Sequence, residues 1–225
     1  MIERNTPHTD STATDSRTAT RVAVREIDSE AELHQFVRWA AMCGIGDPDY
    51  LVESLLGFHQ EGLLDSDRVT HRATVRNTLD THGVPAAAAT RTTALVAVAD
   101  GRIVGGVLTG PTLWLLTRAI VISPDHLLLA LLRTAEIQVL AVDEPYRHTG
   151  IGTALVHAAT AAAKAMKAHV LYGQFPNTPV LTSFYRAAGL TVQKSGTAVQ
   201  FNPLAGIDMT VTPAPEDRIF THGLR

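Results

Sequence analysis

The chain lacks several residues and charge patterns that would point directly to a function. Cys43 is the only cysteine among the 225 residues, so no internal disulfide can form and no cysteine-rich metal site exists. The formal net charge of −3 argues against the broad basic face of a general nucleic-acid-binding protein. A single cysteine suits a reducing compartment, and we expect a cytoplasmic protein.

Long apolar runs are also absent. The most apolar stretch, residues 113–132, is interrupted by Arg118 and by the polar group Ser123-Pro124-Asp125-His126. A membrane helix needs about 20 mainly apolar residues, so we expect no membrane span. Residues 1–20 are rich in Thr, Ser and Asp and have no apolar core of a signal peptide. We expect them to form a disordered N-terminal tail.

Common catalytic and nucleotide-binding motifs are missing as well. No Walker A loop occurs, and Leu155 stands where a dinucleotide fingerprint would have its third glycine. No Gly-x-Ser-x-Gly element indicates a serine hydrolase. The histidines form no i, i+4 pair, so we infer no metal site.

The most informative stretch is residues 136–152, EIQVLAVDEPYRHTGIG. Five of its first seven residues, Ile137, Val139, Leu140, Ala141 and Val142, are apolar and rich in β-branched side chains, which is typical of a strand. Residues 153–166 are rich in Ala and contain neither Gly nor Pro, which predicts a helix. Gly150 and Gly152 lie between the two, where a glycine allows positive φ and close approach of a ligand to the backbone.

A glycine-rich loop before a helix can bind an anion. The first N–H groups of a helix have no partner within the helix, and its dipole places positive charge there. The arrangement therefore suits a phosphate or pyrophosphate. From these residues alone, a tight strand-to-helix turn without a ligand remains an equal alternative.

The preceding part of the chain predicts strands and helices in a defined order. Residues 21–27 alternate as a first strand, and Ser29 with Glu32 forms a capping box for a helix. Asp47-Pro48 begins a second helix, a weaker third helix covers residues 66–80, and residues 84–89 are interpreted as a linker. Residues 93–99 and 102–108 flank Asp100-Gly101, which strongly predicts a hairpin.

After the long helix, residues 169–173 predict another strand and Thr178-Pro179 begins another helix. Residues 190–194 are expected to pair with residues 197–201 across Ser195-Gly196. Residues 213–225 are interpreted as a C-terminal tail.

Arg147-His148-Thr149-Gly150-Ile151-Gly152, after an apolar strand, resembles the acetyl-CoA-binding signature of the GNAT superfamily of N-acetyltransferases. The resemblance implies that backbone amides from about His148 to Thr153 hold the CoA pyrophosphate. It also implies that main-chain groups of Leu140, Ala141 and Val142 contact the pantetheine arm and the thioester carbonyl.

A second match supports the first. Phe184-Tyr185-Arg186-Ala187-Ala188-Gly189-Leu190 resembles the ending Phe-Tyr-x-x-x-Gly-Phe of the same family, with Leu190 in place of Phe. The resemblance implies that Tyr185 is the general acid that protonates the departing thiolate. It also suggests that Asn177 binds CoA, although this residue lies eight rather than seven positions before the tyrosine.

Glu136 begins the predicted strand within Ala-Glu-Ile, and its placement resembles that of the general-base glutamate in histone-acetylating members. A surface glutamate at a strand end is the alternative. Strict alternation would place Glu136 on one face with Gln138, Leu140 and Val142, opposite Ile137, Val139 and Ala141. On that face Gln138 is an alternative group for orienting a water.

The resemblance implies an α/β fold with a mixed, mostly antiparallel sheet of six to seven strands, flanked by helices and split in a V at the CoA site. We expect one domain over residues 21–212, with residues 113–134 as an atypical apolar insert. That insert could extend the third strand, cap the acceptor cleft or pack against a second subunit in a homodimer.

The expected reaction is acetyl transfer from the co-substrate acetyl-CoA to a primary amine of unknown identity, with general base and acid assistance and without a metal. A non-catalytic acyl-CoA-binding module and another acyl donor are the alternatives.

Overall fold

A computed structural model describes residues 22–64 and 71–224. The proposed N-terminal tail, residues 1–20, lies outside these ranges. Seven strands form one sheet in the order β1-β2-β3-β4-β5-β9-β6. The bounds of these strands are β1 Val22–Glu26, β2 Thr93–Ala99, β3 Arg102–Gly110, β4 Thr134–Val142, β5 Val170–Pro176, β9 Asp217–Gly223 and β6 Thr191–Val192. All neighbouring pairs are antiparallel except β4 and β5. The expected fold class is therefore confirmed.

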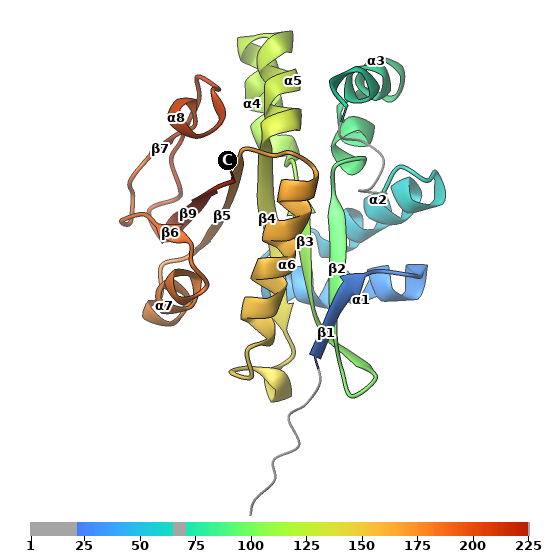
Figure 1. Cartoon of the computed structure of the whole chain (residues 1–225), viewed down its shortest axis with the longest axis vertical. Helices are drawn as coiled ribbons and strands as arrows, with labels where there is room; N and C mark the ends of the chain where they lie inside the picture. The colour runs from blue at the N-terminus through green and yellow to red at the C-terminus, as the bar shows by residue number, and fades with distance from the viewer. Residues whose placement is uncertain (1–21, 65–70, 225) are drawn as a thin grey trace, which may run out of the picture.

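Helices cover both faces of this sheet (Figure 1). The helices are α1 Glu30–Met42, α2 Pro48–Gln60, α3 Arg72–Ala89, α4 Leu113–Ile122, α5 Pro124–Arg133, α6 Ile151–Ala165, α7 Pro179–Ala187 and α8 Asn202–Ala205, with a 3-10 turn η1 at Glu144–Tyr146. One apolar cluster lies between α6 and the sheet, and a second lies between α1 and the opposite face. A third cluster joins α3, α4 and α5 to the C-terminal segment.

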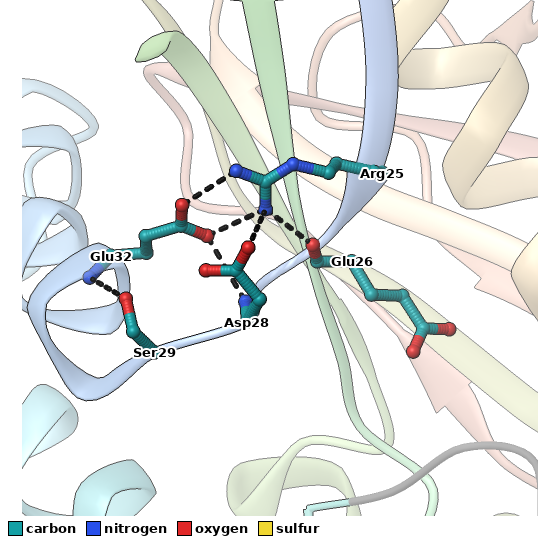
Figure 2. Close-up of polar contacts among 5 residues, drawn as sticks. All are labelled: Arg25, Glu26, Asp28, Ser29 and Glu32. Carbon is teal, nitrogen blue, oxygen red and sulfur yellow. Dashed lines mark hydrogen bonds and ion pairs between the residues drawn. The ribbon is translucent and has the colours of Figure 1, made fainter.

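The start of α1 follows the predicted capping pattern (Figure 2). Ser29 is the N-cap, and its hydroxyl accepts from the Glu32 backbone N–H at 3.4 Å. The Glu32 carboxylate accepts from the backbone N–H of Asp28 and from both terminal nitrogens of Arg25, at 2.7 and 2.6 Å. The hydrogen bond from Arg25 is the main cause of the lowered pKa of Glu32. These contacts join the end of β1 to the start of α1.

Strands β4 and β5 diverge after a short parallel contact. They pair only over Thr134–Glu136 against Val170–Tyr172, so the remaining residues of β4 have no hydrogen-bonded neighbour on that side. The gap between the strands opens toward the loop before α6, which agrees with the V-shaped split expected from the sequence.

A β-bulge in β4 makes the alternation of side chains differ from the one expected from the sequence. Leu108 pairs with Val139 and the next residue of β3 pairs with Ile137, so Gln138 is an extra residue in β4. Ile137 packs beneath α6, as do Leu140 and Val142, whereas Val139 packs with α1. Glu136 therefore does not share a face with Leu140 and Val142, because the bulge reverses the alternation between them.

The C-terminal segment was wrongly interpreted as a tail. Within residues 213–225, β9 pairs with β5 along its whole length and with β6 on its other edge. This pairing also replaces the expected hairpin across Ser195-Gly196. Instead, β7 Val199–Gln200 pairs with β8 Thr210–Val211 in a separate small sheet.

Residues 84–89, interpreted as a linker, are helical. Gly83 has φ of 83° and separates two helical segments within α3. Pro85 lies at the start of the second segment, a position that tolerates its missing N–H, and residues 86–89 are buried. The apolar insert is a pair of helices, α4 and α5, which pack against each other and against α3.

Candidate active site

Two cavities lie along β4, one on each side of the bulge. The first, which we name the loop cavity, has a volume of about 750 Å³. Its walls come from the end of α1, the second half of β4, the loop before α6, and α7. They include Cys43, Leu140, Ala141, Val142, Arg147, His148, Gly150, Gly152, Thr153, Phe184 and Tyr185. Most residues expected to bind the donor therefore line one cavity together with the candidate acid.

The loop before α6 has the backbone that its glycines predict. Gly150 is the N-cap of α6 with φ of 89°, and no side chain caps the helix. The first turn contains no acidic residue, so its N–H groups and positive dipole end stay available to an anion. His148 also has positive φ, at 63°. Gly152 lies close to Phe184. A Cβ added at Gly152 would be only 3.1 Å from the Phe184 ring.

Polar contacts hold this loop in position. The Asp143 carboxylate, at the end of β4, accepts from Trp39 Nε1 at 3.0 Å and from Arg38 at 2.9 Å, which joins the strand to α1. Arg147 Nε donates to the Val142 carbonyl at 3.1 Å. The Thr149 hydroxyl donates to the Tyr146 carbonyl at 2.6 Å. The Thr149 side chain is therefore committed to the turn, which leaves its backbone amide as the group that could contact a ligand.

Three of the residues expected to bind CoA do not line the cavity: Thr149, whose side chain bonds within the turn, Ile151 and Asn177. Ile151 is the first residue of α6 and its side chain is buried in the apolar cluster against the sheet, so only its backbone could face the loop. Asn177 lies beyond β5, where its side chain accepts from Arg218 Nε and donates to the Ser195 hydroxyl. The structure does not bring Asn177 to the loop cavity. Its side-chain amide is instead hydrogen-bonded to Arg218 of β9 and to Ser195.

Tyr185 lies on α7 with its ring packed in an aromatic cluster. It stacks on Phe220 with ring centroids 4.5 Å apart and contacts Phe175 at 4.6 Å. The side chain is 7% exposed and lines the loop cavity, and its hydroxyl makes no hydrogen bond to another described residue. Burial, with a smaller contribution from Cys43, raises its pKa. The hydroxyl therefore stays protonated at neutral pH and is available as a donor.

The second cavity, which we name the apolar cavity, has a volume of about 400 Å³. It lies between α2, the end of α3, the start of α4, and β4. Glu136 and Gln138 line it, whereas the next cavity-lining residue of β4, Leu140, lines the loop cavity. In the segment after α1, Cys43 likewise lines the loop cavity and Ile45 lines the apolar cavity. The linings of the two cavities therefore follow one another along β4, and the change from one to the other falls at the bulge.

Glu136 is buried, not a surface residue at a strand end. It pairs with Tyr172 at the last hydrogen-bonded position before β4 and β5 diverge, and it is 6% exposed. Its Oε2 accepts from the Thr112 hydroxyl at 2.8 Å and from Trp114 Nε1 at 2.9 Å. The Tyr172 hydroxyl lies 3.0 Å from the Thr112 hydroxyl. Burial raises the pKa of Glu136, and these hydrogen bonds partly oppose the shift.

Sequence reasoning missed the groups around Glu136. Thr112 and Trp114 lie at the start of the apolar insert, whose role the sequence left open, and Tyr172 was assigned only to a strand. An aromatic N–H in an otherwise apolar segment was the available signal, since a buried Trp needs a hydrogen-bond acceptor. Gln138 donates weakly to the Gly110 and Pro111 carbonyls, at 3.4 and 3.5 Å.

Comparison with known proteins identifies the family. The family model of GNAT acetyltransferases matches residues 62–190, more than half of the chain. The chain belongs to the GNAT family of acetyltransferases. The enzyme class expected from the sequence, an acyl-CoA N-acetyltransferase, is thereby confirmed. No curated protein matches the sequence significantly.

Several solved structures are similar to this GNAT protein. A protein of Desulfovibrio desulfuricans described as a GNAT-family acetyltransferase matches with a TM-score of 0.51 at 15% identity, over 91% of this chain and 100% of the other. Ard1 of Thermoplasma volcanium gives a TM-score of 0.49 at 13% identity, over 90% of this chain and 97% of the other. The PaiA N-acetyltransferase of Thermoplasma acidophilum, solved with coenzyme A, gives 0.48 at 16% identity over 90% and 99%. In the described part of the chain, no helix is long and apolar enough to span a membrane.

Proposed function

We propose that the protein transfers an acetyl group from acetyl-CoA to a primary amine, with the donor in the loop cavity and the acceptor in the apolar cavity. The observation that supports this proposal is that the two cavities are lined by neighbouring residues of β4, on either side of its bulge. Glu136 lines the cavity on one side of that point, and Tyr185 lines the cavity on the other. An acetyltransferase needs these two groups on opposite sides of the reacting carbonyl.

The residues of the loop cavity fit the donor. The unpaired amides of residues 148–153 would hold the pyrophosphate, aided by the dipole of α6. The Arg147 guanidinium, exposed at the cavity wall, would add a positive charge. The main chain of residues 140–142 has no strand neighbour on the β5 side. Apart from the Val142 carbonyl, which accepts from Arg147, and the Leu140 carbonyl, which accepts from Cys43 Sγ, its polar groups can pair with the pantetheine arm. We omit Asn177 from this set because its side chain is bonded elsewhere.

Glu136 is the proposed base. An amine of pKa about 10.4 is almost entirely protonated at pH 7, so it must lose a proton before it attacks. Along a strand, residues rise by about 3.3 Å each, which places the Glu136 backbone roughly 10 Å from Val139, beyond the bulge. We therefore propose that the proton passes from the amine to Glu136 through water, with the Gln138 side-chain oxygen orienting that water.

Tyr185 is the proposed acid. The amine nitrogen forms a bond to the thioester carbon as the carbon–sulfur bond breaks, and the sulfur leaves as a thiolate. The Tyr185 hydroxyl donates its proton to that sulfur, which yields the free thiol of CoA. Because the hydroxyl has no partner among the described residues, its proton is available for this step.

The test measures release of free CoA thiol from acetyl-CoA, with and without a panel of primary amines. The proposal predicts thiol release that depends on an amine and forms an equal amount of acetylated amine. Tight binding of acetyl-CoA with no amine-dependent release would contradict the proposal and favour a non-catalytic acyl-CoA-binding module. Release from a longer acyl-CoA but not from acetyl-CoA would assign another donor.

A further inference from the structure

The lining of the apolar cavity restricts the acceptor, if the proposed function holds. Apolar side chains form most of its walls, from α2 and from the start of the apolar insert. Those that an acceptor would contact include Ile45, Leu51, Leu55, Phe58, Leu113 and Trp114. Burial of an apolar body against such walls contributes about 25 cal/mol per Å². The cavity therefore favours an acceptor whose body is mainly apolar.

The ionisable side chains in the lining of the apolar cavity restrict the acceptor further. Among the described lining residues, Glu136 is the only ionisable side chain, and no Lys, Arg or His lines the cavity. Arg118 is exposed, with its guanidinium carbon 6.0 Å from the centre of the Trp114 ring, but it does not line the cavity. The acidic residues Asp49 and Glu53 of α2 are exposed and do not line it either.

We propose that the acceptor is a monoamine: one primary amino group on an apolar body that carries no carboxylate. Its amino group lies toward Glu136, the one acidic side chain among the described residues of the lining, and its body lies against α2 and Trp114. Among the described lining residues, a second ammonium would have no anionic partner and a carboxylate would have no cationic partner. Burying an unpaired ion is strongly unfavourable, so both additions reduce acetylation.

Matched pairs of acceptors test this inference at saturating acetyl-CoA. Hexylamine and hexamethylenediamine differ by one terminal ammonium, and phenethylamine and phenylalanine differ by one carboxylate. We expect kcat/KM to be at least about 100-fold higher for the first member of each pair, because the penalty for an unpaired buried ion is several times the 1.36 kcal/mol of a tenfold change. Phenylalanine amide, which lacks the negative charge, should recover most of the loss.

Equal or better use of the diamine or of phenylalanine would overturn the inference and leave the proposed acetyl transfer intact. If no amine is acetylated although calorimetry shows acetyl-CoA binding, the proposed function and the inference fail together. The two failures are therefore distinguishable in one set of assays.

A variant of the cavity wall tests whether the diamine is disfavoured because the lining offers no second anionic side chain. Ser54 lines the cavity from α2 and is half-buried. Ser54→Asp should raise the kcat/KM ratio of hexamethylenediamine to hexylamine by about tenfold, and Ser54→Asn, which has the same size without the charge, should leave that ratio near the wild-type value. An unchanged ratio in a folded Ser54→Asp variant would show that the body of the acceptor does not lie along α2, which would also overturn the inference.

Discussion

Gly150 is the position where a single charge most directly tests the proposed donor site. Gly150→Asp places a carboxylate at the N-cap of α6, where we propose that the pyrophosphate binds. A Cβ at Gly150 would meet no atom within 4 Å, so the new side chain has room. The backbone has φ of 89°, and a non-glycine residue in this region costs about 1–2 kcal/mol of stability, with Asp and Asn among the best tolerated.

The effect of the charge on CoA affinity can be worked out separately. Two like charges about 4 Å apart repel by about 4 kcal/mol near a protein surface and by about 1 kcal/mol in bulk water. Because Gly150 is exposed, we expect a value between these limits, roughly 2–3 kcal/mol, which corresponds to about 30- to 150-fold weaker binding. The repulsion should decrease as salt is raised, since the screening length is about 10 Å at 0.1 M ionic strength.

Gly150→Asn is the matched control, because it has the shape and backbone cost of Asp without the charge. Titration calorimetry with CoA should show the loss in the Asp variant beyond any loss in the Asn variant. S-acetylpantetheine lacks the pyrophosphate, so it should serve as an acetyl donor for both variants with similar KM values. Equal CoA affinity of folded Asp and Asn variants would refute the assignment of the pyrophosphate to this loop.

Three further predictions concern the proposed acid, the proposed base and a buried structural cation. Tyr185→Phe keeps the ring contacts and should lower kcat by about 10²-fold or more with little change in CoA affinity, so wild-type kcat would reject the acid role. Burial raises the pKa of Glu136 in the folded protein, so ionisation of this group costs stability as pH rises from its unfolded pKa of about 4.3 through the folded value. The free energy of unfolding of wild type relative to Glu136→Gln should therefore fall with rising pH in urea titrations, and the acidic limb of kcat should disappear in the variant; a parallel pH dependence of both proteins would contradict the shift. Arg91 is buried and donates to three backbone carbonyls at the ends of α5 and α6, at 2.7–2.9 Å. Arg91→Met should therefore lower the free energy of unfolding by about 3–5 kcal/mol in urea titrations. A loss below about 1 kcal/mol would show that these hydrogen bonds add little to stability.

The sequence predicted the parts of the fold that depend on local chemistry. The Ser29 cap, the Asp100-Gly101 hairpin and the strand–loop–helix around Gly150 all follow from backbone preferences of a few adjacent residues. The gathering of Tyr185 with the glycine loop followed from a family resemblance, because its ring lies on an element 35 residues later in the chain.

The remaining differences arise from contacts between distant residues. Residues 217–223 contain only two apolar side chains, Ile219 and Phe220, and their strand character depends on pairing with β5. The same pairing takes β6 away from the turn at Ser195-Gly196. Gly83 and Pro85 are typical of a linker, but burial of the four following alanines favours a kinked helix.

The bulge at Gln138 had the largest consequence for the site. Side-chain alternation predicts faces only while the ladder is uninterrupted, and no local residue preference marks this bulge. The bulge places Glu136 in the apolar cavity and Leu140 beneath α6. It therefore separates the proposed acceptor and donor sites along one strand.

A crystal structure of the protein with CoA and a bound amine would test the central claim most directly. The account predicts pyrophosphate density at the amides of residues 148–153, the CoA sulfur near Leu140 and Tyr185, and the amine on the Glu136 side of the β4 bulge. A cofactor bound away from the glycine loop, or CoA and amine on the same side of the bulge, would contradict it.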